Sequence, residues 1–478
     1  MIENSQKTMY TVSKQSDKTV SRDSQLTITI QVINIIYKYK YLDNNITIKM
    51  RLSCKKIKKE MDKICFPIFG TSISFQKLYD IGKLDDKTCN TLSNITQLYF
   101  ETCYISSIDM ANKLAKLIEL CSLINVIHFD DVISDNDNDN IFKIIANKLG
   151  DCINLQMLTL SSNNITSYGL KELCNNIIKC KQIHTFNISD NVFGTNSDAL
   201  IQLANTLKNL ECLSSLDISN NHLDDIGFAA VAAALPNCLK LSSLNLSNID
   251  ISKIGLGILA DVLPKCLKLE TLDFSNNEIR SIGMTKFISA LQLCQKLKSI
   301  DISENELGEI GIKICAAVLP QCQDLSSIKI GSNDIRTNAL YTFTKSIINS
   351  NLRYRLSTLD ISNTNISDGG ISCGISILRN FLPKCLVLSN LNLSNTCKDI
   401  TFSGLKSLAK TFIQCEQLSC LDITSNNFSD KKLQIIANVF PYCESLSEVT
   451  ITINNDESMQ IIKNVFTLCE RLKIICKK

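Results

Sequence analysis

The chain has 478 residues, of which 45% are apolar and 20% are charged, and it contains no tryptophan. Its formal net charge of +3 is too small to attract nucleic acid in bulk, and no run of apolar residues is long enough to cross a membrane. The composition therefore favours a protein with an aliphatic core that binds neither nucleic acid nor a membrane.

The N-terminal segment is basic and differs in composition from the rest. Residues 1–65 contain 13 Lys and Arg against 6 Asp and Glu, which leaves 37 against 41 for the remainder. Residues 1–25 are polar without the apolar core of a signal peptide, and we predict a disordered arm. For residues 26–94 we predict a small basic domain of a β-hairpin, a short helix at 54–65 and a connector. It is either a cap for the following array or a small functional domain.

From residue 95 onward a repeated pattern fills the chain, and residues 213–322 show it most clearly. Each unit approximates Leu-x-x-Leu-x-Leu-x-x-Asn-x-Leu, followed by glycine and an apolar helical stretch that ends in cysteine. A unit of this length cannot bury its own apolar face, so neighbouring units must stack. We predict a solenoid over 95–478 with about 13 repeats and a truncated unit at Leu472 and Ile475. The central strand residues, 28 to 32 positions apart, are Leu98, Ile127, Leu158, Phe186, Leu216, Leu244, Leu272, Ile300, Ile328, Leu359, Leu391, Leu421 and Val449.

Most of the 22 cysteines share one place in the repeat. One cysteine per unit at the turn from helix to strand indicates a buried thiol, and neighbours one repeat apart are too distant to bridge easily. We predict structural thiols, a reducing compartment and hence a cytoplasmic protein. The cysteines that lie six residues before a central strand residue are Cys121, Cys152, Cys180, Cys238, Cys266, Cys294, Cys322, Cys385, Cys415, Cys443 and Cys469.

Asparagine and glycine also recur in phase. An asparagine where the chain leaves the strand can bond unpaired backbone groups, and Thr364, Thr396 and Cys103 can substitute for it. Val132 and Ile249 cannot, so we predict looser turns there. A phased glycine such as Gly255 is predicted to mark a tight backbone turn before the helix. The phased asparagines are Asn163, Asn191, Asn221, Asn277, Asn305, Asn333, Asn426 and Asn454.

With its unit length, Asn-x-Leu turn, phased glycine and terminal cysteine, this pattern resembles ribonuclease-inhibitor-type leucine-rich repeats. The resemblance covers about four fifths of the chain and implies an α/β horseshoe. Parallel strands would line its concave face and helices its convex face. The same repeat type forms the sensor arm of nucleotide-binding immune receptors and the body of Ran GTPase-activating proteins, so it specifies the fold more than the function.

Because side chains alternate along a strand, the concave face can be derived from the sequence. The outward residue after each central strand residue forms a row that is acidic in its middle. This row is either a binding surface for a basic protein or a set of solvated residues that are typical of this repeat. The candidate binding residues are Asn187, Asp217, Asn245, Asp273, Asp301, Lys329, Asp360, Asn392 and Asp422, with Tyr99, His128, Thr159 and Thr450 continuing the row.

Three irregular segments are further candidates. Arg353, Tyr354 and Arg355 lie in a repeat without the phased cysteine and form either a contact for an acidic partner or a solvated helix end. The aspartates from Asp135 to Asp139 resemble the start of a calcium loop. They lack its later glycine and glutamate, so a solvated loop is favoured and no metal is predicted. The lysines of 55–59 are either one face of a helix or a nuclear-import or phosphate-contacting patch.

The sequence contains no P-loop, H-E-x-x-H or G-x-S-x-G motif, and we predict neither an enzyme nor a bound cofactor. We expect a monomeric intracellular scaffold that binds a protein partner on its concave face or loop edges. One alternative is a regulator of a small GTPase resembling Ran GTPase-activating proteins, although the chain ends in Lys477 and Lys478 where those proteins carry an acidic tail. Another follows from the Ile-, Asn- and Lys-rich composition: an effector secreted by an intracellular bacterium that binds host proteins.

Overall fold

In a computed structural model of the chain, the contacts divide it into two compact units, Met1–Cys65 and Phe66–Lys478. The structure describes residues 67–70, 95–101, 105–133, 138–194, 196–223, 225–364, 374–469 and 472–477, all in the second unit. The predicted arm, hairpin and basic helix lie outside the described residues, as do Asp135, Asp137 and Cys103.

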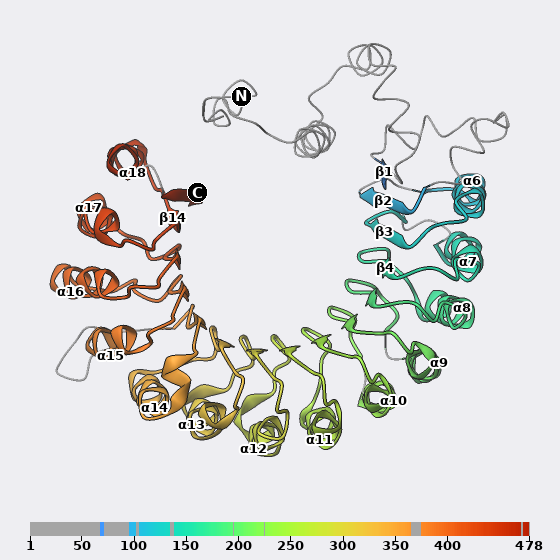
Figure 1. The fold of residues 1–478 in the computed structure, drawn as a ribbon, viewed down its shortest axis with the longest axis horizontal. Coiled ribbons are helices and arrows are strands. Elements are labelled where there is room, and N and C mark those ends of the chain that lie inside the picture. The colour runs from blue at the N-terminus through green and yellow to red at the C-terminus, as the bar shows by residue number, and fades with distance from the viewer. Residues whose placement is uncertain are drawn as a thin grey trace, which may run out of the picture. The chain divides into compact units, whose positions relative to one another are not determined.

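The described residues form one parallel sheet of fifteen strands, in which each strand pairs with the next along the chain (Figure 1). β1 lies within the segment predicted as a connector, so the sheet begins before residue 95. The strands are β1 (Pro67–Gly70), β2 (Gln97–Glu101), β3 (Val126–Asp130), β4 (Met157–Thr159), β5 (Thr185–Asn187), β6 (Ser215–Asp217), β7 (Ser243–Asn245), β8 (Thr271–Asp273), β9 (Ser299–Asp301), β10 (Ser327–Lys329), β11 (Thr358–Asp360), β12 (Asn390–Asn392), β13 (Cys420–Asp422), β14 (Glu448–Thr452) and β15 (Lys473–Lys477).

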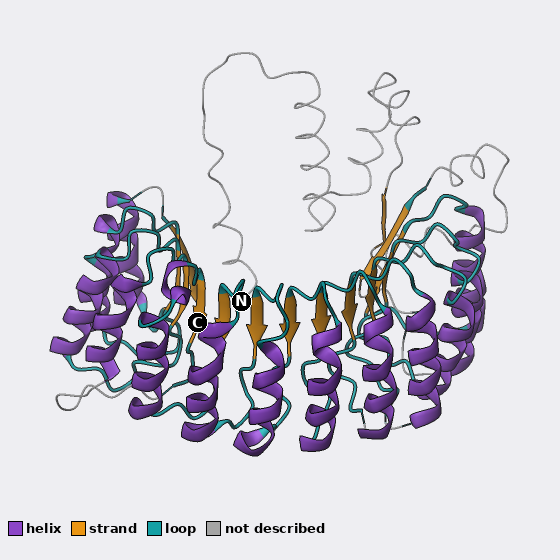
Figure 2. Ribbon diagram, turned by 60° about the horizontal axis from the view of Figure 1, so that its bottom comes forward, coloured by secondary structure: helices purple, strands orange, loops and turns teal. Residues whose placement is uncertain are grey.

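One α-helix connects each pair of strands from β2 onward and packs on the outer side of the sheet (Figure 2). The helices are α6 (Ile108–Leu120), α7 (Asn138–Leu149), α8 (Ser167–Ile177), α9 (Ser197–Asn209), α10 (Asp225–Ala234), α11 (Lys253–Val262), α12 (Arg280–Leu291), α13 (Gly308–Val318), α14 (Thr337–Ile348), α15 (Gly374–Phe381), α16 (Phe402–Ile413), α17 (Asp430–Ala437) and α18 (Asp456–Leu468). Short 3-10 turns follow six of them: η2 (Leu235–Asn237), η3 (Leu263–Lys265), η4 (Leu319–Gln321), η5 (Asn351–Tyr354), η6 (Leu382–Lys384) and η7 (Phe440–Tyr442).

The predicted leucine-rich repeat solenoid is confirmed. The thirteen predicted central strand residues pair directly from strand to strand and are at most 2% exposed. The strands lie on the concave side of this unit and the helices on its convex side. One assignment is wrong: the central residue of the final unit is Ile474, which pairs with Val449, and not Ile475, which pairs with Thr450 in the outward row. The final spacing is 25 residues, shorter than any earlier one, which shifts the register by one.

The phased asparagines connect neighbouring repeats through hydrogen bonds. Asn333 is fully buried, and its Oδ1 accepts from the backbone N–H groups of Asn305 at 2.9 Å and Leu307 at 3.3 Å in the preceding repeat. Its Nδ2 donates to the Ile302 carbonyl at 2.8 Å, also in the preceding repeat. Each such amide satisfies backbone groups that the short strands leave unpaired. Asn454 differs because it is exposed and its Nδ2 donates only to the Phe428 carbonyl, at 3.4 Å.

The two apolar residues at this phase do not leave their backbone unpaired. The N–H of Val132 donates to Asn163 Oδ1 at 2.9 Å, and the N–H of Ile249 donates to Asn277 Oδ1 at 3.1 Å. The N–H groups of these two residues are therefore paired, because the following repeat supplies the acceptor. The Ile249 side chain has no amide group, so it cannot form the hydrogen bonds to the preceding repeat that the phased asparagines form.

The phased glycines lie within the first helical turn rather than in a tight turn before it. A Cβ on Gly255 would come within 2.9 Å of Asp225 Oδ1 and of Ile251 Cγ2, and one on Gly283 within 2.7 Å of Leu256 Cδ2. Close packing of each helix against its neighbours, and not a positive φ, requires glycine at these places.

The phased cysteines are buried at the turn from helix to strand, except for the half-buried Cys152, and all cysteines in the described segments are free thiols. Burial raises the pKa of the Cys238 and Cys294 thiols to about 12 and that of Cys266 to about 11. Cys180 Sγ donates to the Leu149 carbonyl of the preceding repeat at 3.4 Å. These thiols act as small apolar packing groups that remain protonated at neutral pH.

Candidate protein-binding face

The outward row that the sequence predicts runs unbroken along the concave side of the sheet. Asp217, Asn245, Asp273, Asp301, Lys329, Asp360, Asn392 and Asp422 pair in one line from β6 to β13. These side chains are half-buried. Asn187 continues the line on β5, followed toward the N-terminus by Thr159, His128 and Tyr99, and Thr450 follows on β14.

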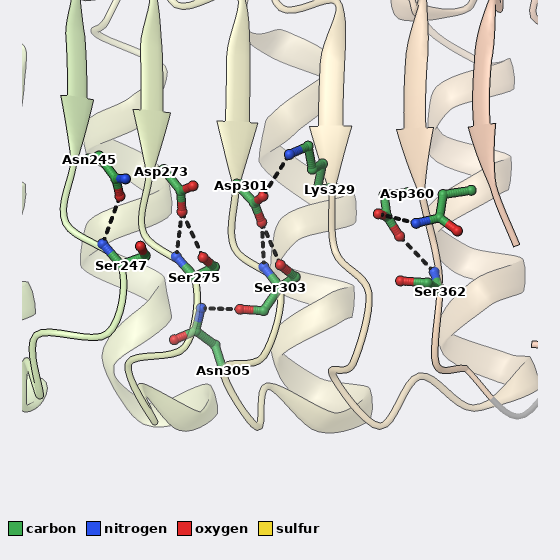
Figure 3. A network of polar contacts seen from close by, with 11 residues as sticks. Asn245, Ser247, Asp273, Ser275, Asp301, Ser303, Asn305, Lys329, Asp360 and Ser362 are labelled. Atoms are coloured by element: carbon green, nitrogen blue, oxygen red, sulfur yellow. Dashed lines mark hydrogen bonds and ion pairs between the residues drawn. The ribbon is translucent and has the colours of Figure 1, made fainter. Parts of the chain in front are cut away.

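The acidic and amide side chains of this row hold the backbone turn that follows each strand. Asp273 Oδ1 accepts from the Ser275 N–H at 3.0 Å and from its hydroxyl at 2.7 Å, and Asp301 Oδ1 bonds Ser303 in the same way (Figure 3). Asn245 Oδ1 accepts from the Ser247 N–H at 3.0 Å. One oxygen of each side chain therefore has a structural role that the sequence reasoning missed, and aspartate and asparagine are equivalent in it.

The second carboxylate oxygen distinguishes the aspartates from one another. Asp217 Oδ2 accepts from Asn245 Nδ2 at 3.1 Å, and Asp360 Oδ2 accepts from Asn392 Nδ2 at 2.7 Å. In the part of the chain that the structure describes, the second oxygens of Asp273 and Asp422 accept no hydrogen bond. These two oxygens therefore have all of their lone pairs available to a partner, whereas the second oxygens of Asp217 and Asp360 already accept one bond each.

Lys329 is the single cation in the middle of this row, from Asp217 to Asp422. Its Nζ lies 3.1 Å from Asp301 Oδ2, with side-chain exposures of 44% and 13% (Figure 3). Burial lowers the pKa of Lys329, but Asp301, Asp273 and Asp360 outweigh it and raise the pKa above its usual value. Burial also raises the pKa of Asp273, and the nearby charge of Asp301 adds to this effect. The lysine thus neutralises Asp301 and leaves Asp273 in a site that favours a second cation.

Two shallow depressions lie on either side of Lys329. The first, of about 280 Å³, is lined by Asp217, Asp273 and Asp301 together with small hydroxyl side chains. The second, of about 230 Å³, is lined by Asp360, Asp422 and Glu448, with Cys420 between them. Each depression contains one of the aspartates with an unbonded oxygen. The sequence gives no direct signal of these depressions, because they arise from small side chains on adjacent strands.

Serines occupy the position two residues before the central strand residue in most repeats from β6 to β14, interrupted by the Glu270–Lys298 ion pair at β8 and β9. The Ser242 hydroxyl donates to the Ser214 carbonyl at 3.0 Å, and the Ser389 hydroxyl donates to the Ser357 carbonyl at 3.1 Å. Ser326, Ser357, Ser419 and Ser447 repeat this contact with the preceding strand. This part of the surface is therefore polar, and the hydroxyl groups of these serines are already bonded to the preceding strand.

The irregular segment at Arg353, Tyr354 and Arg355 lies away from this row, around the turn η5 that precedes β11. The Arg353 guanidinium lies 4.4 Å from the Tyr354 ring centroid, and its Nη1 donates to the Ile348 carbonyl at 2.9 Å. Arg355 donates from Nε to the Leu325 carbonyl at 3.0 Å and from Nη2 to the Cys322 carbonyl at 2.5 Å. Arg355 thus fastens this repeat to the preceding one. Tyr354, 49% exposed, presents its ring to solvent.

Neither a metal site nor a membrane span is evident within the described segments. No group of three metal-binding side chains occurs there, and no helix there is long and apolar enough to span a bilayer. Of the acidic loop's aspartates, Asp130 accepts from the Ser161 hydroxyl at 2.7 Å and Asp139 accepts from the Thr166 hydroxyl. Both of these carboxylates are used within the fold.

Comparison with known proteins identifies the repeat. A family model described as Leucine Rich repeat matches residues 151–174, 209–232 and 265–287. No curated protein matches the chain in sequence. Among solved structures, the chain is similar to the leucine-rich repeat-containing protein LegL7 from Legionella pneumophila, with 17% identity and a TM-score of 0.38 over 57% of this chain and 85% of that one.

Two further structures are similar over most of the chain. A leucine-rich repeat protein of Leptospira interrogans has 14% identity and a TM-score of 0.40, over 86% of this chain and 100% of that one. A chain of the yeast Rad7 and Elc1 complex has 14% identity and a TM-score of 0.43, over 86% of this chain and 94% of that one.

Proposed function

We propose that this leucine-rich repeat protein is an intracellular scaffold whose concave face binds a basic segment of another protein. The observation that carries the proposal is the pair of depressions beside Lys329, each with an aspartate oxygen, on Asp273 or Asp422, that no described donor occupies. Leucine-rich repeats are generally protein-interaction scaffolds, and the repeats fill most of the chain. A preformed sheet of this kind binds with little change in shape.

The chemistry of the face favours a partner that brings lysine or arginine. A cation near Asp273 would offset the cost of holding its charge among neighbouring carboxylates, and Asp422 in the second depression could receive another. The middle of the row, from β5 to β13, contains no tryptophan, tyrosine or arginine, the side chains that dominate tight interfaces. We therefore expect an interaction of moderate affinity that weakens as salt is added.

Asparagine substitutions test this proposal without disturbing the turns. Asn187, Asn245 and Asn392 already make the turn bond in this chain, so Asp273→Asn and Asp422→Asn keep it and remove only charge. We expect the double variant to bind its partner at least about thirtyfold more weakly, since the two lost charged hydrogen bonds together cost about 2 kcal/mol or more. Affinity capture from the source cell with the full chain, followed by titration of the recovered protein, measures this.

The same row offers a matched control. Asp217→Asn and Asp360→Asn remove the same charge from carboxylates that already bond Asn245 and Asn392, so their effect should be smaller. A second control, Asp198→Asn with Asp261→Asn, changes two exposed helix residues on the convex side. Equal loss of binding in all three double variants, or no loss in any, would refute a specific role for Asp273 and Asp422.

A further inference from the structure

One edge of the solenoid, at the turns from helix to strand, exposes leucines beside lysines in consecutive repeats. Leu239 and Leu267 lie five residues before the central residues of β7 and β8 and are 75% and 77% exposed. Lys240, Lys268 and Lys296, each four residues before the central residue of β7, β8 or β9, are exposed as well. Leu293, 62% exposed, follows α12 in the third of these repeats. These six residues are called the leucine–lysine edge below.

The turns that carry these residues lie against one another. η2, which precedes Leu239, contacts η3, which precedes Leu267, and η3 contacts α12, which precedes Leu293. The leucine–lysine edge is therefore one surface that spans three neighbouring repeats, and not three isolated positions. Exposed apolar side chains that gather in this way are typical of interaction sites.

The fold itself does not account for these side chains. The phased cysteines Cys238 and Cys266 beside them are buried, whereas the leucines point away from the core. Lys240 Nζ contacts only Cys212 Sγ, at 3.4 Å, and within the described residues Lys268 and Lys296 form no ion pair. By contrast, Lys298 pairs with Glu270 at 2.8 Å and Lys286 pairs with Asp261 at 2.7 Å. The three lysines of the edge thus retain a positive charge next to apolar surface.

We propose that the leucine–lysine edge binds an acidic segment, carrying apolar side chains, of a second protein. The leucines would be covered by the apolar side chains of that segment, and its carboxylates would pair with the three ammonium groups. This site is separate from the concave row and of opposite charge, so the inference does not rest on the function proposed above. A chain with both sites could bring a basic protein and an acidic protein together.

The length of the edge favours a protein segment over an anionic membrane. The same turn positions carry acidic residues on both sides of the three repeats: Glu211 before them, and Asp324, Glu416 and Glu444 after them, all exposed. A membrane would contact the whole edge of the array and so meet these carboxylates, whereas a short segment can lie on the basic repeats alone.

Fluorescence anisotropy with labelled synthetic peptides and the full chain tests the inference. We expect a peptide of alternating glutamate and leucine to bind, and a glutamate–serine peptide or a lysine–leucine peptide of the same length to bind at least about tenfold more weakly. Leu239→Ser with Leu267→Ser, and separately Lys240→Glu with Lys268→Glu, should each weaken binding of the first peptide by at least about tenfold.

A matched control lies in the same repeats. Ile226 and Ile254, in the first turns of α10 and α11, are 69% and 59% exposed, and their change to serine should leave peptide binding unaltered. The concave variants Asp273→Asn and Asp422→Asn should also leave it unaltered, which separates this inference from the proposed function. No binding of the glutamate–leucine peptide, or equal binding by the edge variants and the wild type, would overturn it. So would edge-dependent binding to phosphatidylserine vesicles in place of the peptide.

Discussion

Raising the pH from about 8 to about 10.5 in the presence of a reductant is expected to unfold this protein, because its buried thiols must stay protonated for the repeats to pack. Burial raises the pKa of these thiols from the ordinary 9.0 to about 11 or about 12. The eleven that are both buried and shifted in this way are Cys121, Cys174, Cys180, Cys238, Cys266, Cys294, Cys315, Cys322, Cys385, Cys397 and Cys415.

The direction of the effect follows from proton binding. Above about pH 9 the unfolded chain loses its thiol protons while the folded chain keeps them, so the free energy of unfolding falls as pH rises. Each such thiol lowers the free energy of unfolding by about 1.4 kcal/mol per pH unit, and eleven of them together lower it by more than about 10 kcal/mol within one pH unit. That is comparable with the whole stability of an ordinary domain, about 5–15 kcal/mol. The contribution is fully present below about pH 9 and is lost on the way to about pH 12.

Far-ultraviolet circular dichroism along a pH titration measures this loss. Changing Cys238, Cys266, Cys294 and Cys322 to alanine should make the free energy of unfolding fall less steeply with pH. The cavities that these changes create lower the stability at neutral pH. Cys212→Ala is the control, since this thiol is only half-buried and solvent reaches it in the folded chain. An unchanged slope in the fourfold variant would show that the buried thiols do not govern the alkaline transition.

Asn333→Ala is expected to lower the free energy of unfolding by roughly 3–5 kcal/mol, because it leaves several buried backbone groups without partners. The N–H groups of Asn305 and Leu307 lose their acceptor, and the Ile302 carbonyl loses a donor. None of these can turn to water, because the site is fully buried. The loss should appear as a lower midpoint in urea unfolding followed by circular dichroism.

The control for this prediction is Asn205→Ala, in the exposed middle of α9. Alanine favours the helix there, so stability should stay within about 0.5 kcal/mol of the wild type. A similar midpoint for Asn333→Ala and Asn205→Ala would mean that the phased asparagines are replaceable by water or by small backbone shifts.

The sequence predicts the repeats well because one pattern recurs and every copy must pack against its neighbour. The central strand residues and the outward row therefore align as expected. The final unit has a shorter spacing, and its central residue is Ile474, one residue before the predicted Ile475. Periodicity cannot reveal which oxygen of an aspartate is already bonded, and this separates Asp273 from Asp217. It also cannot show whether Gly255 is needed for a turn or for close packing.

The roles of individual surfaces are the least predictable part. The sequence predicts Arg355 as either a partner contact or part of a solvated helix end, and it does not reveal that the guanidinium bonds two carbonyl groups of the preceding repeat. Leu239 and Leu267 occupy a phase at which other repeats carry exposed charged residues such as Glu211, so periodicity can predict their exposure. That their turns lie against one another is evident only in three dimensions. The GTPase-regulator and secreted-effector hypotheses stay predictions from sequence, since no described residue bears on either.

The asparagine bonds between repeats have a mechanical consequence. They form continuous runs from Asn163 to Asn221 and from Asn277 to Asn333, and they stop where Ile249 and Thr364 replace the amide. When the two ends of the array are pulled apart in an optical trap, extension should begin at these two joints, because no hydrogen bond of a phased asparagine side chain among the described residues crosses them. The solenoid is thus expected to lengthen in discrete steps, with each run of bonded repeats separating as a unit, rather than gradually along its whole length.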